Sequence, residues 1–367
     1  MKDSKKTTKE SSDVEHLSVG MTTYRPAAIT QYPATGSELT SSSSNVTSPW
    51  SSSRDAALYF QCAVVIVGVA GAAANALIIY AMVASEQHKK NLLIFNQNAL
   101  DFASCLFLVL TYSLKLCDVY LTGTLGYWLC MLILSENFMW WTIVGSTINL
   151  VSITVERYLK VVHSVWSKRW LRDWTIYSAI AFAWIGGFIV NAVPIFLTSA
   201  VIDGICYSVA FWPSPADKLA YGIWYFISFY AIVLFLFIFC YARILTTIRR
   251  QTSVMARYSS AQKKSNQMQS NVIKTMILVS AFFAITWTPL DVYYLLIMIN
   301  SDMSLLDSGY YALTSMAFLY ICTNPFIYAT KFDPVRRTLL SFIPCKKNSE
   351  QYELGDIGSS SARTGQD

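Results

Sequence analysis

The sequence predicts an all-α membrane protein, a bundle of seven transmembrane helices with a short amphipathic helix on the membrane surface. Hydrophobic residues make up 54% of the 367 residues and charged residues only 14%, well below the usual quarter for a soluble domain. The apolar residues gather in seven runs, each near or above the length that spans a bilayer. These runs lack the two-residue alternation of a membrane β-barrel, so helices are favoured.

The seven runs leave little sequence for a soluble domain. Residues 1–55 are rich in Ser and Thr and are expected to form a disordered extracellular tail. The bundle is expected over 56–331, the amphipathic helix over 332–345 and a cytoplasmic tail over 346–367. The predicted spans are 57–84, 92–117, 127–161, 174–199, 219–248, 269–299 and 307–330.

Basic residues concentrate after the first, third, fifth and seventh runs, whereas Lys218 is the only base in the opposite loops. The positive-inside rule therefore predicts a multi-pass plasma-membrane protein with its amino terminus outside and its carboxyl terminus inside. The net charge of +6 follows from this topology, and no nucleic-acid partner is expected. Asn45 is a predicted glycosylation site on the outer side, and Cys345 is a predicted acylation site on the inner side.

The first three runs each carry polar residues. Asn75 follows small residues that allow close helix packing, and it is expected to be a packing amide. Asp101 is a lone carboxylate in mid-membrane. It is either a functional group or part of a structural cluster of polar side chains that includes Asn75. The stretch 130–162 contains no Pro and is expected to form one unbroken helix. It ends on Glu156-Arg157-Tyr158, whose charged pair should face the protein interior or the inner water boundary.

The later runs contain aromatic residues and two predicted kinks. Pro289 should bend the sixth run beside Trp287, and Pro325 should bend the seventh between Asn324 and Tyr328. Two cysteines, Cys130 and Cys206, fall on the oxidising outer face, where a disulfide is expected and Cys117 is the competing partner.

These motifs resemble those of the rhodopsin-like (class A) G-protein-coupled receptors over about residues 57–345. Each motif alone is short, but six in the right order on the expected helices are specific. They are Asn75, Asp101, Glu156-Arg157-Tyr158, Trp184 with Pro194, Phe283-x-x-x-Trp287-x-Pro289, and Asn324-Pro325-x-x-Tyr328.

The resemblance implies a mechanism for signalling. An extracellular ligand would bind among the outer halves of the helices, and the inner end of the sixth helix would swing out to admit a heterotrimeric G protein. Arrestin is a second expected partner, and membrane lipid surrounds the bundle. The residues implied in this switch are Glu156, Arg157, Tyr158, Tyr241, Phe283, Trp287, Pro289, Asn324, Pro325 and Tyr328.

The resemblance also implies a polar core formed by Asn75, Asp101, Ser146 and Asn324. Members of the family often hold a sodium ion beside the residue equivalent to Asp101. An allosteric sodium ion is therefore the one cofactor that the sequence leads us to expect, and it would favour the resting state.

Two features depart from the family pattern. Val233 stands where the fifth helix usually has a proline, and Thr147 replaces the residue that packs against it. Cys130 lies about two residues farther from Arg157 than usual. A disulfide from Cys130 to Cys206 would therefore need a local adjustment of the third helix.

The ligand is constrained mainly by what the pocket lacks. Met139 stands where amine receptors carry an Asp, and Phe318 where opsins carry the retinal Lys. Two acids near the outer side, Asp291 and Glu136, favour a cationic ligand such as a basic or amidated peptide. Alternatively, Glu136 pairs with Lys115 and Asp291 is hydrated. Candidate pocket residues are Glu136, Met139, Asp291, Trp287, Tyr294 and Phe318.

Other function classes are less consistent with the sequence. A transporter would show internal repeats, and none is found. An enzyme is not expected, because His16, His88 and His163 all lie outside the apolar runs. A receptor for a small non-amine or lipid ligand is an alternative. A non-signalling ligand binder is another, although the intact Glu156-Arg157-Tyr158 argues against it.

Overall fold

The computed structural model describes residues 49–254, 260–299, 308–331 and 333–341. Within these ranges, seven helical segments are long and apolar enough to cross a membrane, as the sequence predicts. The first, second, fourth, sixth and seventh spans are α1 (Pro49–Ala84), α3 (Leu92–Leu116), α7 (Asp173–Thr198), α10 (Ser260–Ile299) and α11 (Ser308–Lys331).

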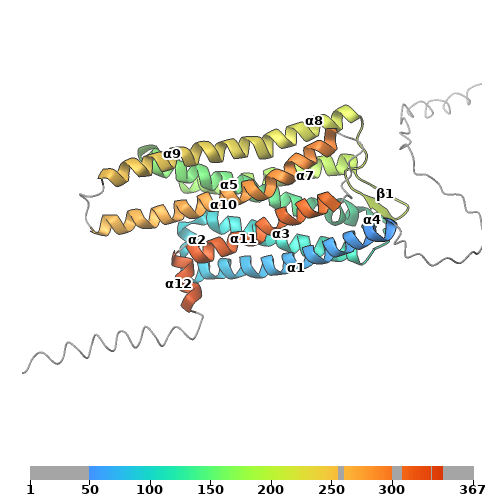
Figure 1. The fold of residues 1–367 in the computed structure, drawn as a ribbon, viewed down its shortest axis with the longest axis horizontal. Coiled ribbons are helices and arrows are strands. Elements are labelled where there is room, and N and C mark those ends of the chain that lie inside the picture. The colour runs from blue at the N-terminus through green and yellow to red at the C-terminus, as the bar shows by residue number, and fades with distance from the viewer. Residues whose placement is uncertain (1–48, 255–259, 300–307, 332, 342–367) are drawn as a thin grey trace, which may run out of the picture. The chain divides into compact units, whose positions relative to one another are not determined.

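The third and fifth spans are composite. The third consists of α4 (Gly123–Leu129), a π-helix (Cys130–Leu134) and α5 (Asn137–Val162), and the fifth of α8 (Pro215–Tyr225), a π-helix (Phe226–Ala231) and α9 (Ile232–Val254). The shorter elements are α2 (Gln87–Lys90), α6 (Ser164–Trp170), α12 (Asp333–Ser341), β1 (Ala200–Ile202) and β2 (Ile205–Tyr207). The β-hairpin, α4 and α8 lie at one end of the bundle, and α2 and α12 at the other (Figure 1).

α1 and α10 begin furthest before their predicted spans. α1 begins at Pro49, so the last seven residues assigned to the disordered tail are helical. Proline is favoured in the first turn of a helix, where its missing N–H is not needed, and no helix breaker follows before the apolar run. α10 begins at Ser260, nine residues before the predicted start. Of the predicted amphipathic helix, Asp333–Ser341 is helical, and positions 332 and 342–345 lie outside the described residues.

The third span is not the unbroken helix that the sequence led us to expect. Ser135 and Glu136 separate the π-helix from α5, and Glu136 has a left-handed backbone with φ 64°. A π-turn contains more residues per turn than an α-helix. Together with the break, it takes up the extra residues between Cys130 and Arg157, as the predicted local adjustment requires. Cys130 forms the disulfide with Cys206.

The β-hairpin positions Cys206 for this disulfide. Val201 on β1 lies opposite Cys206 on β2, and the two strands are joined by Asp203 and Gly204. Both turn residues have positive φ, 51° and 75°, which is the turn that matches the twist of a two-residue hairpin. The Leu121 N–H donates to the Gly204 carbonyl, 3.0 Å, and this bond ties the hairpin to the loop before α4.

α5 lies at the centre of the packing, since it contacts α3, α7, α9 and α10. Its closest approach is to α7, through Gly145 and Gly187. A Cβ at Gly187 would lie 2.6 Å from the Trp141 carbonyl oxygen and 2.8 Å from the Gly145 nitrogen. The two backbones therefore touch, and small residues are what make such contacts possible in membranes.

We expect Gly187→Ala to destabilise the bundle, because the added methyl group meets backbone that cannot move aside. Forcing a methyl group into a tight contact typically costs about 1–3 kcal/mol. The measurement is the thermal unfolding temperature of the purified protein. Gly186→Ala is the matched control. Its Cβ would meet only side-chain atoms, none closer than 3.4 Å, so its unfolding temperature should be unchanged or higher. Equal behaviour of the two variants would contradict this account of the α5–α7 contact.

Candidate functional site

The polar core is built around Asp101 on α3, which is fully buried. Its Oδ1 accepts a hydrogen bond from Ser146 Oγ on α5, 2.6 Å, and its Oδ2 accepts one from Asn324 Nδ2 on α11, 2.9 Å. The structure therefore brings together three residues of the predicted core from three helices. Because a buried carboxylate is stable only when it is fully hydrogen-bonded, these contacts hold the three helices in register.

A further donor to Asp101 was not expected from the sequence. Gln97 precedes Asp101 by four residues on α3, so both side chains lie on one face of the helix. Its Nε2 donates to both carboxylate oxygens, at 3.3 and 3.5 Å, and also to Ser146 Oγ. The i to i+4 spacing of Gln97 and Asp101 was the available signal, but that spacing alone does not reveal where the amide points.

Gln97 is itself the end of a chain of hydrogen bonds. Trp184 Nε1 on α7 donates to Asn96 Oδ1, 3.0 Å, and Asn96 Nδ2 donates to Asn149 Oδ1 on α5, 2.9 Å. Asn149 Nδ2 then donates to Gln97 Oε1, 2.8 Å. Three of these residues carry amides that would be costly to bury alone. Trp184, which the family motif places on the fourth span, therefore completes a polar network rather than facing only lipid.

This arrangement does not fit the sodium ion that the family resemblance implies. A cation needs several oxygen lone pairs directed at one point, whereas Gln97 and Asn324 present N–H groups to the carboxylate. Ser146 Oγ is likewise engaged by Gln97 as acceptor. Among these four side chains, within the described part of the chain, only Asn324 Oδ1 is a buried acceptor without a partner.

Asn75 joins α1 to α11. Its Nδ2 donates to the Gly71 carbonyl, 3.0 Å, and to the Ile321 carbonyl, 3.4 Å. It makes no hydrogen bond to Asp101 among the described residues. The interpretation of Asn75 as a packing amide therefore agrees with its contacts. The direct link between Asn75 and Asp101, one of the two alternatives that the sequence left open, is not formed.

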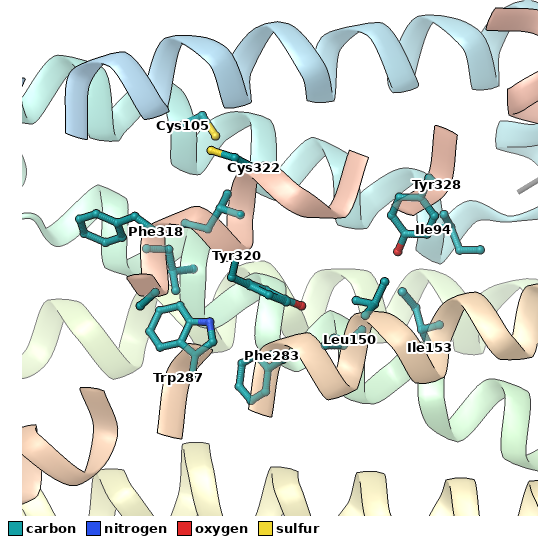
Figure 2. Close-up of a cluster of buried hydrophobic side chains, with 14 of the residues drawn as sticks. Ile94, Cys105, Leu150, Ile153, Phe283, Trp287, Phe318, Tyr320, Cys322 and Tyr328 are labelled. Carbon is teal, nitrogen blue, oxygen red and sulfur yellow. The ribbon is translucent and has the colours of Figure 1, made fainter. Parts of the chain in front are cut away.

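An aromatic layer is part of the buried hydrophobic cluster in the bundle, and Figure 2 shows Phe283, Trp287 and Tyr320 lying close to one another. Phe283 and Trp287 on α10 stack with their centroids 5.9 Å apart, and Tyr320 on α11 meets Phe283 edge-on at 5.5 Å. On α9, Phe237 meets Phe283 edge-on at 5.8 Å. The sixth-span motif is thus packed between the fifth and seventh spans, although Val233 replaces the usual proline.

Trp140 on α5 connects this layer to the predicted pocket residues. Its ring lies 6.1 Å from Trp287 and 6.3 Å from Phe318. Met139, Phe318 and Trp287 are all buried, with exposed fractions of 0%, 1% and 6%. These three predicted pocket residues therefore contribute to the packed core of the bundle.

Glu136 is saturated by neighbouring donors. Its Oε1 accepts from Lys115 Nζ, 2.5 Å, and from Tyr112 Oη, 2.9 Å, while its Oε2 accepts from Trp140 Nε1, 2.9 Å. The pairing with Lys115 that the sequence left open is the one that the structure contains. The ion pair joins α3 to the break before α5, so it also explains how the chain tolerates a left-handed residue there.

Asp291 differs from Glu136 in its partners. It lies on α10 one turn beyond Trp287, and like Glu136 it is partly exposed. Within the described ranges, no residue forms an ion pair or hydrogen bond with it. Nearby, Tyr294 on α10 and Tyr225 on α8 meet edge-on with centroids 5.8 Å apart. Asp291 is therefore the predicted pocket acid with unused hydrogen-bonding capacity.

The opposite end of α5 carries the acid–Arg–aromatic motif. Glu156 Oε2 lies 3.4 Å from Arg157 Nε, and Glu156 Oε1 lies 2.5 Å from Lys160 Nζ. Arg157 also donates through its Nη2 to Asn91 Oδ1, 3.2 Å. Glu156 is thus shared between two cations, and Arg157 between Glu156 and the loop before α3. The third motif residue, Tyr158, contacts His163 through its hydroxyl, 3.2 Å.

Tyr241 and Tyr328 do not meet in this structure. The Tyr241 hydroxyl contacts Thr154 Oγ1 on α5, 2.9 Å, and Ser280 Oγ on α10, 3.0 Å. The Tyr328 hydroxyl is buried without a hydrogen-bond partner in the part of the chain that the structure describes. Tyr241 therefore holds α5, α9 and α10 together at this end, and Tyr328 is available for a different arrangement.

Comparison with known proteins accounts for this set of motifs. Residues 74–328 match the family described as 7 transmembrane receptor (rhodopsin family). The chain belongs to this family. It is a signalling receptor of the class A, G-protein-coupled kind rather than an enzyme, as the motifs imply.

Several curated receptors are similar to this receptor at low identity. Human galanin receptor type 1 is 26% identical over 318 residues, which cover 80% of this chain and 83% of that protein. Mouse neuropeptide Y receptor type 2 is 26% identical over 78% of this chain and 75% of its own. Rat lysophosphatidic acid receptor 3 is 24% identical over 63% of each chain.

Two predicted modification sites are not described by the structure. Asn45 and Cys345 both lie outside the described residues, so glycosylation and acylation stay predictions.

We expect Glu156→Gln to raise basal nucleotide exchange by the receptor. The substitution removes the charge that pairs with Arg157, and both side chains are largely buried. A charge-assisted contact of this kind is worth about 1.5 kcal/mol, or about tenfold in an equilibrium. The measurement is agonist-free exchange on a G protein in membranes with matched receptor density. Lys160→Met is the control, because it leaves Glu156 to Arg157 alone and should not raise exchange. A basal exchange rate in Glu156→Gln at or below that of the wild type would contradict the prediction that this ion pair restrains the receptor.

Proposed function

We propose that this receptor binds a cationic extracellular peptide and activates a heterotrimeric G protein. The observation that carries the ligand class is Asp291, a carboxylate near one end of the bundle that lacks an internal counter-ion among the described residues. A carboxylate shielded from water strongly favours a cationic partner. Two of the similar receptors are named for galanin and neuropeptide Y, which supports a peptide.

The proposed orientation follows from charge and covalent chemistry. The end with the β-hairpin holds the disulfide between Cys130 and Cys206, and disulfides persist in oxidising, extracellular surroundings. Basic residues gather in the loops at the other end. The receptor is therefore proposed to lie in the plasma membrane, with its amino terminus and Asp291 toward the outside and its carboxyl terminus inside.

Activation is proposed to be a population shift between two packed states. The peptide must bind the active state more tightly than the resting state to shift the equilibrium. Pro289 removes a backbone hydrogen bond inside α10, and Asp291 lies half a turn beyond it. A ligand that engages Asp291 therefore acts on the outer arm of a kinked helix. The inner arm is held by the contact between the Ser280 and Tyr241 hydroxyls. Release of this contact would let the inner arm move outward and open a cleft for the G protein. Arrestin is proposed to use the same cleft.

A lysophospholipid is the second candidate ligand, because rat lysophosphatidic acid receptor 3 is among the similar receptors. Such a ligand carries a phosphate, and an unpaired carboxylate in the pocket would repel it. The charge of Asp291 therefore favours the peptide.

The proposal is tested by agonist-stimulated nucleotide exchange in membranes. The library contains peptides, including galanin and neuropeptide Y, together with amines and lysophospholipids, and Arg157→Ala is the signalling-dead control. A response to cationic peptides supports the proposal. A response to lysophospholipids alone would support a G-protein-coupled receptor but would contradict the proposal that its ligand is a cationic peptide.

For any peptide agonist found, Asp291→Asn should lower potency by about tenfold or more, because it removes a charge partner worth about 1.4 kcal/mol or more. Potency is read from concentration–response curves for the peptide and for an analogue in which its basic residue is neutral. The analogue should be affected far less by Asp291→Asn. Asp203→Asn removes an exposed loop charge and controls for long-range attraction. If the two variants and the wild type show the same potencies for both peptides, Asp291 is not the recognition group.

A further inference from the structure

Gln97 occupies the space beside Asp101 in which a cation would have to sit. Its amide nitrogen contacts Oδ1, Oδ2 and Ser146 Oγ. These are the three oxygen atoms that would otherwise converge on an ion at this carboxylate. An amide can in principle turn around and offer its oxygen to a cation, so the question is what fixes its orientation.

The orientation of Gln97 is fixed by its other partner. Gln97 Oε1 already accepts the hydrogen bond from Asn149 Nδ2, 2.8 Å, and Asn149 Nδ2 also donates to the Leu93 carbonyl, 3.0 Å. If the Gln97 amide turned, its N–H would face the N–H of Asn149, and two buried donors would lose their acceptors. That loss is costly in a buried site. The nitrogen of Gln97 therefore has to face Asp101.

The chain behind Gln97 strengthens this donor. The bonds from Trp184 to Asn96, from Asn96 to Asn149 and from Asn149 to Gln97 all run in one direction and end on the carboxylate. Hydrogen bonds aligned in this way polarise one another, by roughly 10–30% per bond. The chain thus delivers partial positive charge to Asp101 from α7 through α3 and α5.

We propose that the Gln97 amide takes the place of the allosteric sodium ion in this receptor, so that its resting state is independent of sodium. The hydrogen-bond network supplies the partial positive charge that stabilises the Asp101 carboxylate, and it does so with groups of the protein itself. It follows that removing the Gln97 amide opens a cation site, because the two Asp101 carboxylate oxygens and Ser146 Oγ lose the donor that they share and are left as oxygen ligands.

The test measures thermal unfolding of the ligand-free receptor in sodium chloride and in choline chloride at equal ionic strength. The wild type should unfold at the same temperature in both salts. Gln97→Leu should unfold at a lower temperature in choline and gain about 2–4 °C in sodium, as expected for binding that contributes about 1 kcal/mol. Adding Asp101→Asn to Gln97→Leu should abolish that gain, because the carboxylate is the principal ligand.

Asn98→Leu is the matched control. Asn98 is the next residue on α3 and is equally buried, but its Nδ2 donates to the Ile94 carbonyl of its own helix. It should show no sodium-selective shift. If Gln97→Leu does not fold, Gln97→Glu keeps the side-chain size and adds a second carboxylate, so it should depend on sodium even more strongly. A sodium-selective shift in the wild type, or its absence in a folded Gln97 variant, overturns the proposal.

Discussion

The fold depends on how the Asp101 carboxylate is satisfied within the membrane. The hydrocarbon core of a bilayer offers no hydrogen-bond donors, so donors from the protein stabilise a carboxylate buried at that depth. The donors come from α3, α5 and α11, and each fixes the rotation and height of its helix relative to the others. A shift of any one helix breaks a charge-assisted hydrogen bond, which is among the stronger contacts that a protein makes.

The two functional ends of the receptor share this anchored centre. α5 carries Ser146 beside Asp101, Trp140 beside Trp287, and Arg157 near its C-terminal end. α10 carries Asp291 on one side of Pro289 and Ser280 on the other. Because packed helices move as rigid bodies with discrete arrangements, a change at Asp291 can reach Ser280 only through the kink and the aromatic layer. The Tyr328 hydroxyl has no hydrogen-bond partner among the residues that the structure describes, which is consistent with a second arrangement in which it gains one.

Long apolar runs made the seven spans predictable from the sequence. The disulfide was predictable because it depends on residue type at two positions, Cys130 and Cys206. The third-span break at Glu136 was not predicted, because nothing in the local sequence disfavours a helix there. Its left-handed backbone is tolerated because Lys115, Tyr112 and Trp140 converge on the side chain from two helices. The hairpin at Asp203-Gly204 had a readable turn signal, although its strands are only three residues long.

Gln97 and Glu136 show why the chemistry of a site needs more than its residue types. Gln97 is one of several amides on α3, and its role depends on Asn149, which lies 52 residues away in the chain. Glu136 and Asp291 are both acids near the same end of the bundle, and the sequence treats them alike. The structure separates them because three donors consume the charge of Glu136, whereas none of the described residues consumes that of Asp291. A charge that the fold already neutralises contributes to stability, and a charge that it leaves unpaired is the one free to select a ligand.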